Sequence, residues 1–154
     1  MMKFQKLSQK NAQYIAHRWK YKDPIAARYT LAKDPIAQQE FISQKLRKKN
    51  YYEVIDADRL FGYLQVEDKD DGLWITLGMR PEFIGQGKGQ TFLDAILEFV
   101  REQYGIDKPL MLAVGLFNER AIHLFRKNKF YDIQTRKFNF DDGQHDYVVL
   151  RRDW

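Results

Sequence analysis

The stretch MRPEFIGQGKGQTFLDAILEFV, from Met79 to Val100, decides the fold, because three alternating glycines stand there between a proline-led turn and a strongly patterned helix. Glycine adopts dihedral angles that other residues avoid and lets another group approach the main chain closely. The start of a helix offers unpaired N–H groups and a partial positive charge. Gly85, Gly87 and Gly89 before this helix therefore predict an anion site of the kind that holds phosphate.

Two familiar glycine motifs do not fit this spacing. A dinucleotide-binding fold needs Gly-x-Gly-x-x-Gly, whereas the third glycine position is occupied by Gln90. A P-loop needs a glycine, four residues and then Gly-Lys-Ser/Thr, whereas Lys88 is followed by Gly89 and the first glycine position holds Glu82. A glycine-rich surface turn before a core helix is the plain structural alternative.

The composition predicts one compact domain over residues 1–154. The chain is 44% hydrophobic and 15% aromatic, which is too apolar for a disordered protein, and its length suits a single core. It contains no cysteine, which excludes a disulfide, a thiolate metal site and a cysteine nucleophile. The N-terminal residues lack the apolar stretch of a signal peptide, and no segment approaches a membrane span. We therefore expect a cytoplasmic protein without membrane contact.

The net charge of +5 raises the question of nucleic-acid binding. Much of the basic charge falls in three separate places, 45–49, 126–129 and 151–152, which favours a solvated surface over one binding stripe. We therefore expect no nucleic-acid partner. RNA binding is a third hypothesis for the function, beside the two described at the end of this subsection. The three histidines do not have metal-ligand spacing, so no metal is expected; they are His17, His123 and His145.

Hydrophobic periodicity gives the order of elements. A strand over 3–8 is followed by a helix that Ser8 caps and that runs through Trp19, and a second helix is expected from Pro35 through 49. Strands are then predicted over 51–57, 60–67 and 73–79, with a hairpin signal at Asp71–Gly72. After the glycine loop come a helix ending at Gly105, a buried strand over 109–117, a helix from Asn118 and a closing hairpin of residues 129–140 and 145–154. This order indicates one mixed sheet with helices against it.

Two motifs on this framework together resemble the GNAT superfamily of acyl-CoA-dependent N-acetyltransferases. In that family a strand leads through a proline turn into Gln/Arg-x-x-Gly-x-Gly/Ala; here PEFIGQGKG, residues 81–89, follows the pattern with Gly87 and Gly89 in register. The later family segment, Asn-x-x-Ala-x-x-x-Tyr-x-x-x-Gly-Phe, matches at Asn118, Ala121 and Phe130. The order of elements is similar to the family's over nearly the whole chain.

The resemblance implies an α+β (α/β layered) fold, with a central mixed, mostly antiparallel twisted sheet of six or seven strands and about four helices. It implies transfer of an acetyl group from acetyl-CoA to an amine of a small molecule or protein by direct attack. Main-chain amides of the glycine loop would hold the pyrophosphate, with pantetheine beside the strand ends at Met79 and Gly115. The cofactor-binding residues it implies are Leu77, Gly78, Met79, Ile84, Gly85, Gln86, Gly87, Lys88, Gly89, Gln90, Asn118 and Phe125. Aromatic residues that would wall the amine pocket, with core packing as the alternative, are Trp19, Tyr21 and Tyr29.

Three positions depart from the family pattern. Ile84 stands at the Gln/Arg site and Lys129 where glycine is usual. Phe125 replaces the tyrosine that would protonate the departing thiolate, and a phenylalanine has no proton to give. Tyr131 and Tyr147, on the closing strands, are substitute candidates.

The general base is left unassigned, because the strand over 73–79 contains no carboxylate. Glu53 and Glu67, on neighbouring strands, are the candidates, with solvated surface positions as the alternative. A catalytically weak CoA-binding regulatory module is the alternative function that these departures favour. The acceptor stays open, and a homodimer formed through the closing hairpin is a possible oligomer.

Overall fold

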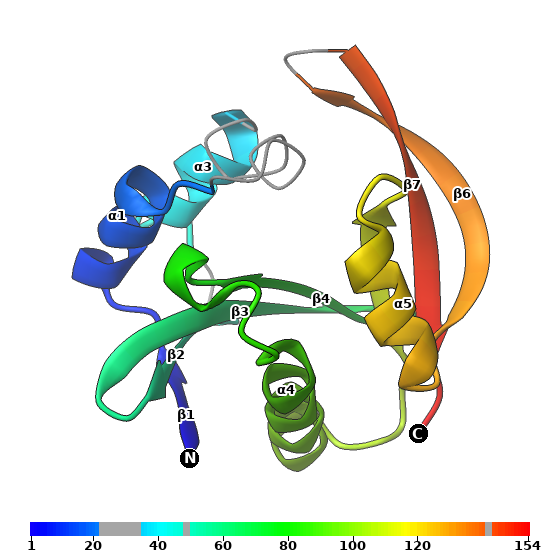
Figure 1. Ribbon diagram of the computed structural model, residues 1–154, viewed down its shortest axis with the longest axis horizontal. Helices are drawn as coiled ribbons and strands as arrows, with labels where there is room; N and C mark the ends of the chain where they lie inside the picture. The colour runs from blue at the N-terminus through cyan, green and yellow to red at the C-terminus, as the bar shows by residue number, and fades with distance from the viewer. Residues whose placement is uncertain (22–34, 48–49, 141–142) are drawn as a thin grey trace. The chain divides into compact units, whose positions relative to one another are not determined.

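The computed structural model describes residues 1–21, 35–47, 50–140 and 143–154. Seven strands form one sheet (Figure 1), in the order β1 (Met2–Lys6), β2 (Tyr51–Asp56), β3 (Arg59–Lys69), β4 (Gly72–Met79), β5 (Leu110–Gly115), β7 (Gly143–Arg152) and β6 (Tyr131–Phe140). β4 and β5 are parallel, whereas β1–β2, β2–β3, β5–β7 and β6–β7 are antiparallel. The predicted α+β fold with a mixed, mostly antiparallel sheet is confirmed.

The chain divides into two compact units. The first unit comprises Met1–Gln65 and Leu77–Lys88, and the second comprises Val66–Thr76 and Gly89–Trp154. Strands β3 and β4 run through both units. The expectation of a single domain over residues 1–154 stays a prediction.

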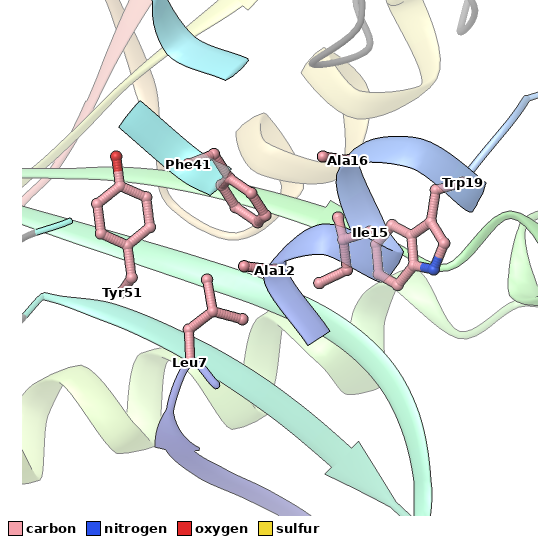
Figure 2. Close-up of a cluster of buried hydrophobic side chains, with 7 residues drawn as sticks. All are labelled: Leu7, Ala12, Ile15, Ala16, Trp19, Phe41 and Tyr51. Atoms are coloured by element: carbon pink, nitrogen blue, oxygen red, sulfur yellow. The ribbon is translucent and has the colours of Figure 1, made fainter. Parts of the chain in front are cut away.

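The first unit has its core between helices α1 (Gln9–Arg18) and α3 (Pro35–Ile42) and the strands beside them. The Ser8 side chain accepts a hydrogen bond from the Asn11 amide at 3.1 Å, which caps α1 as the sequence predicts. Figure 2 shows the buried apolar cluster, which consists of Leu7, Ala12, Ile15, Ala16, Trp19, Phe41 and Tyr51. The sequence of α1 thus turns one apolar face toward the core.

The second helix is shorter than its apolar pattern predicts, so this expectation was wrong at the C-terminal end. α3 ends at Ile42, and Leu46, expected on its apolar face, is 54% exposed. The Ser43 hydroxyl accepts a hydrogen bond from the Leu46 amide at 3.2 Å, which favours a local turn over a continued helix. Arg47 Nη1 donates to the Phe41 carbonyl at 2.7 Å, satisfying an unpaired group at the helix end. The predicted N-cap, Asp34, lies outside the described residues.

The turn between β2 and β3 also differs from expectation. Ala57 and Asp58 both have positive φ, 49° and 62°, as a two-residue type I′ hairpin requires. The sequence predicts the turn at 58–59 instead. Neither Ala57 nor Asp58 is a glycine, the residue type that usually indicates a turn of this kind. The chain therefore accepts local backbone strain there to keep the strand register.

The second unit contains helices α4 (Gly89–Tyr104) and α5 (Glu119–Lys127) together with β5, β6 and β7. Figure 1 shows α5 lying along β7. The apolar face of α4 is buried through Phe92, Leu93, Ile96 and Val100, and Gly105 ends the helix with φ of +83°. On α5, Ile122 and Phe125 are buried. Among the described helices, none is long and apolar enough to cross a membrane.

Candidate functional site

The glycine loop has the open backbone that the sequence predicts. After the 3-10 turn η2 (Pro81–Phe83), Gly85 and Gly87 adopt φ of +82° and +71°, and α4 begins at Gly89. A Cβ built at Gly85 or Gly87 would have no heavy atom of the described residues within 4 Å. Glycine is therefore needed at these two positions for the backbone conformation, not because the protein crowds them. The space beside both α-carbons is free for a ligand.

Arg80 anchors the start of this loop within the first unit. Its amide donates to the Phe61 carbonyl at 2.7 Å, and its guanidinium donates to the Leu60 carbonyl, at 3.3 Å, and to the Tyr14 hydroxyl, at 3.1 Å. It also forms a short ion pair with Glu82, inside the 3-10 turn. One side chain thus ties the turn to β3 and α1. The role of Arg80 was not predicted from the sequence. Its position between the end of β4 at Met79 and the turn that begins at Pro81 was the signal that could have indicated it.

An aromatic and cationic stack supports the same loop. The rings of Phe61 and Phe83 are stacked, with centroids 5.1 Å apart. Arg59 and Lys88 both lie over the Phe83 ring, at 5.1 and 5.7 Å from its centroid. Gln86 Nε2 closes the loop by donating to the Glu82 carbonyl at 2.9 Å, whereas Ile84 is 40% exposed. Lys88 therefore carries positive charge beside the open amides.

The end of β4 is shaped by two tyrosines. A Cβ on Gly78 would come within 2.2 Å of the Tyr63 ring, so glycine is required there for close packing. Burial raises the pKa of Tyr63 to about 12. The Tyr21 hydroxyl donates to the Met79 carbonyl at 2.9 Å, and burial, followed by the neighbouring Tyr63, raises the pKa of Tyr21. Both phenols are neutral at physiological pH, and Tyr21 holds the last peptide of the strand.

The three aromatic residues predicted to line the pocket for the amine acceptor have different environments. Trp19 is buried in the core cluster, and its ring centroid lies 6.1 Å from that of Tyr63. Its indole N–H has no hydrogen-bond partner in the described part of the chain. Tyr21 is partly buried and bonded to β4, as above, and Tyr29 lies outside the described residues. The role of this aromatic group in binding an amine stays a prediction.

In the second unit, the first turn of α4 is joined to the last turn of α5. The side-chain amides of Gln90 and Asn128 exchange two hydrogen bonds, of 2.8 and 2.9 Å, and Asn128 also donates to the Leu124 carbonyl at 2.7 Å. A Cβ on Gly89 would lie 3.3 Å from Leu124. Gln90, predicted to bind the cofactor, thus uses its side chain for hydrogen bonds between the two helices.

Two other predicted cofactor residues have structural roles in the same unit. The Asn118 side chain accepts from the Ala121 amide at 3.3 Å and caps α5. Phe125 is 5% exposed and packs edge-on against Phe130, with ring centroids 5.4 Å apart. Lys129 has φ of +74°, which explains why glycine is usual at its position. Phe125 therefore belongs to the core.

The two candidate bases are engaged differently. Glu53 is 3% exposed and accepts hydrogen bonds from the Ser8 amide, at 2.9 Å, and from Gln5 Nε2, at 2.7 Å. Burial by itself raises the pKa of Glu53, but hydrogen bonds from Ser8, Gln5 and Asn11 outweigh it and lower the pKa. Glu67 is half exposed and pairs with Lys69 at 3.7 Å. Glu53 is thus tied into the first unit as an ionised carboxylate, which is a poor arrangement for a base.

No group of three or more His, Cys, Asp or Glu side chains in the described residues could hold a metal ion. What the chain offers instead is main-chain N–H groups beside basic side chains. Such an arrangement can bind a phosphate or pyrophosphate group.

Comparisons with known proteins identify the family of this chain. The model of the acetyltransferase (GNAT) family matches residues 14–130. A search of curated protein sequences gives no significant match. Similar solved structures include spermidine N-acetyltransferase from Vibrio cholerae in complex with CoA and spermine, with a TM-score of 0.76, 16% identity, and coverage of 97% of this chain and 94% of that one.

Two further structures share the fold. The ribosomal-protein-S18-alanine N-acetyltransferase from Escherichia coli has a TM-score of 0.69 and 16% identity, covering 99% of this chain and 93% of that one. A GNAT-family acetyltransferase from Bacillus anthracis has a TM-score of 0.72 and 11% identity, covering 97% and 93%. At these identities the likeness concerns the fold alone, whereas the family model spans most of the sequence. The chain belongs to the acetyltransferase (GNAT) family.

Proposed function

We propose that this protein is an enzyme that moves an acetyl group from acetyl-CoA to an amine. The observation that carries the proposal is the pair of glycines with positive φ, Gly85 and Gly87, whose α-carbons face open space just before α4. A pyrophosphate is an anion that can accept hydrogen bonds from several adjacent amides. The complex of the spermidine N-acetyltransferase with CoA supports the choice of ligand.

The residues of the first unit have distinct roles in this proposal. The loop amides hold the pyrophosphate, with Lys88 adding positive charge and Arg80 keeping the turn in place. The Met79 amide donates to the thioester oxygen, where negative charge develops during attack; one such donor contributes on the order of 3 kcal/mol. Tyr21 restrains the Met79 carbonyl and so limits the freedom of this strand end.

The chemistry needs a neutral amine. A primary amine is mostly protonated at pH 7, so it loses a proton before its nitrogen attacks the thioester carbon. The C–S bond then breaks and CoA leaves as a thiolate, which is tolerable without an acid because a thiol has a pKa of about 8.5. The amine proton leaves to solvent or to a base that we do not assign, since Glu53 is already bonded. Slow turnover is expected.

A thermal-shift measurement with matched glycine variants tests the ligand. Gly105, at the end of α4, has the same features as Gly87, with φ of +83° and nothing within 4 Å of a Cβ. Gly87→Val and Gly105→Val should therefore lose similar stability in the free protein. Acetyl-CoA at 100 times its Kd should stabilise wild type and Gly105→Val by about 2.7 kcal/mol, but not Gly87→Val. Equal stabilisation of both variants would refute the loop assignment.

The alternative is a CoA-binding regulatory module with little turnover. The burial of Phe125 and the absence of a carboxylate from the sequence of β4 favour it. Both functions predict saturable binding of CoA. Release of free thiol, measured with acetyl-CoA and a panel of amines, separates them, because only an enzyme releases thiol in proportion to the amine present.

A further inference from the structure

Two cations beside the glycine loop have no anionic partner among the described residues. Within the first unit, the Arg59 guanidinium and the Lys88 ammonium lie 5.1 and 5.7 Å from the centroid of the Phe83 ring. Neither side chain forms an ion pair or a hydrogen bond with the part of the chain that the structure describes. Arg59 is exposed and Lys88 is half-buried, so both can be reached by a ligand.

Arg80, in the same turn, is engaged differently. Its guanidinium donates to the Leu60 carbonyl at 3.3 Å and to the Tyr14 hydroxyl at 3.1 Å, and it forms an ion pair with Glu82. Its charge is therefore balanced within the protein, and its donors hold the turn in place. Arg59 has no such partners to account for its position over the turn.

Phe83 positions the two free cations without using their hydrogen-bond donors. The ring is itself held by stacking on the buried Phe61, with centroids 5.1 Å apart. A cation–π contact attracts the charge to the ring and leaves the N–H groups free to bind another molecule. An arginine has five such donors and a lysine has three. Arg59 and Lys88 thus supply positive charge that is positioned but not neutralised.

This charge lies next to the open backbone of the loop. Phe83 precedes Gly85 by two residues, so their α-carbons are at most about 7 Å apart. Lys88 directly follows Gly87. Both glycines have positive φ, and a Cβ on either would have no heavy atom of the described residues within 4 Å. An anion on the loop amides and a second anion near Arg59 can therefore belong to one ligand.

The chemistry of the pair suits a phosphate monoester. Such a group carries a charge of about −1.5 to −2 at pH 7 and has three oxygens that accept strong hydrogen bonds. The planar guanidinium of Arg59 can donate to two of these oxygens at once, and Lys88 adds a point charge. Two unpaired cations therefore match the charge of one monoester.

We propose that Arg59 and Lys88 form a second anion subsite, which binds a phosphate monoester of the ligand whose pyrophosphate is held by the loop. This inference rests on the proposed function. In CoA the monoester is the 3′-phosphate, which is attached to the same ribose as the pyrophosphate. Arg59 begins β3 and lies outside the loop motif of residues 81–89, so this subsite adds a selection for the phosphorylated ribose that the motif does not contain.

The test compares the dissociation constants of CoA and of dephospho-CoA, which lacks the 3′-phosphate, measured by isothermal titration calorimetry. In wild type, CoA should bind at least about tenfold more tightly. Arg59→Gln should lower this ratio to about threefold or less, and the double variant Arg59→Gln/Lys88→Gln should bring it to about one. A folding defect weakens the binding of both ligands alike, so the ratio reports on the monoester alone.

Lys6→Gln is the matched control, because it removes an exposed positive charge from the same unit. Strand register places Arg59 opposite Asp56, and Asp56 opposite Met2. Lys6 lies four residues further along β1, and so about 13 Å from that row. This exceeds the screening length of about 8 Å at 0.15 M salt. Lys6→Gln should therefore keep the wild-type ratio.

A second readout reports on the arginine itself. The Nε–H resonance of Arg59, identified by its loss in Arg59→Gln, is followed by NMR while each ligand is added to saturation. The resonance should shift with CoA and stay near its free position with dephospho-CoA, because only CoA brings a phosphate to this guanidinium.

The outcomes separate the two proposals. Equal affinities for CoA and dephospho-CoA in wild type, or an unchanged ratio in Arg59→Gln, would overturn the inference and leave the proposed function standing. If the preference depends on Arg59 but no amine releases thiol, the subsite is supported while the enzyme proposal fails. If neither ligand binds, both proposals are overturned.

Discussion

Replacing Glu53 by glutamine should destabilise the protein, because this carboxylate joins β2 to the start of α1. It accepts from the Ser8 amide and from Gln5 Nε2, at 2.9 and 2.7 Å, while only 3% exposed. Glutamine keeps one acceptor oxygen but replaces the other oxygen by an NH2 group. This group would face the N–H of Gln5 or of Ser8, which is itself a donor. Losing one hydrogen bond to a buried charge costs about 2 kcal/mol. For a chain of this size that lowers Tm by about 4–8 °C.

The pH dependence provides a second signature of the same interaction. Hydrogen bonds lower the pKa of Glu53 in the folded protein below its ordinary value of 4.5. The carboxylate therefore stabilises the fold above pH 4.5, and this contribution is lost as the pH falls through the folded pKa. The Tm difference between wild type and Glu53→Gln should consequently be largest near pH 7 and shrink toward pH 3.5.

The matched control is Glu67→Gln, which removes an exposed carboxylate 3.7 Å from Lys69. Exposed pairs contribute little, so its Tm at pH 7 should change by no more than about 2 °C. Differential scanning fluorimetry across pH measures all three proteins. If Glu53→Gln kept the wild-type Tm but abolished acetyl transfer, Glu53 would be a base and the structural reasoning would be wrong.

Three further changes have defined outcomes. Lys129→Gly should raise Tm by about 2–4 °C, because about 1 kcal/mol of strain at φ of +74° is relieved; a fall in Tm would contradict this. Gly78→Ala should cost about 1–3 kcal/mol in urea unfolding, through the 2.2 Å clash with Tyr63, and much less in a Tyr63→Leu background; equal costs would refute the clash. In a thiol-release assay Tyr147→Phe should slow turnover and Tyr131→Phe should not, because only Tyr147 lies opposite the end of β5; equal rates would exclude Tyr147 as proton donor.

The elements of this fold could be predicted from sequence because their signals are local. Ser8 caps α1, Asn118 caps α5 and Gly105 ends α4, each through a contact within a few residues. The glycine loop could be predicted for the same reason, since positive φ at Gly85 and Gly87 is a property of the residue type.

Two of the features that sequence reasoning missed depend on contacts between residues far apart in the chain, whereas the early end of α3 and the turn at Ala57 and Asp58 are local. Arg80 binds groups on β3 and α1, up to 66 positions away. The pattern of α3 continues past Ile42, but a serine side chain ends the helix there. The Arg136 guanidinium lies over the Trp74 ring, and these two side chains can meet only after β4, β5, β7 and β6 have assembled into the sheet. Apolar periodicity contains no information about such contacts, because it describes one element at a time.

Phe125 illustrates how a departure from the family changes the chemistry. Its ring packs against Phe130 in the core of the second unit, so Phe125 cannot protonate the departing thiolate of the proposed reaction. Tyr131 is a poor donor: it lies opposite Arg151, its hydroxyl already donates to Asp153 at 2.7 Å, and that bond raises its pKa. Tyr147 lies opposite Gly115, at the end of β5, which is one of the strand ends beside which the family resemblance places pantetheine. If a tyrosine of the closing hairpin replaces the missing acid, strand register favours Tyr147, because it lies opposite the end of β5 and Tyr131 does not.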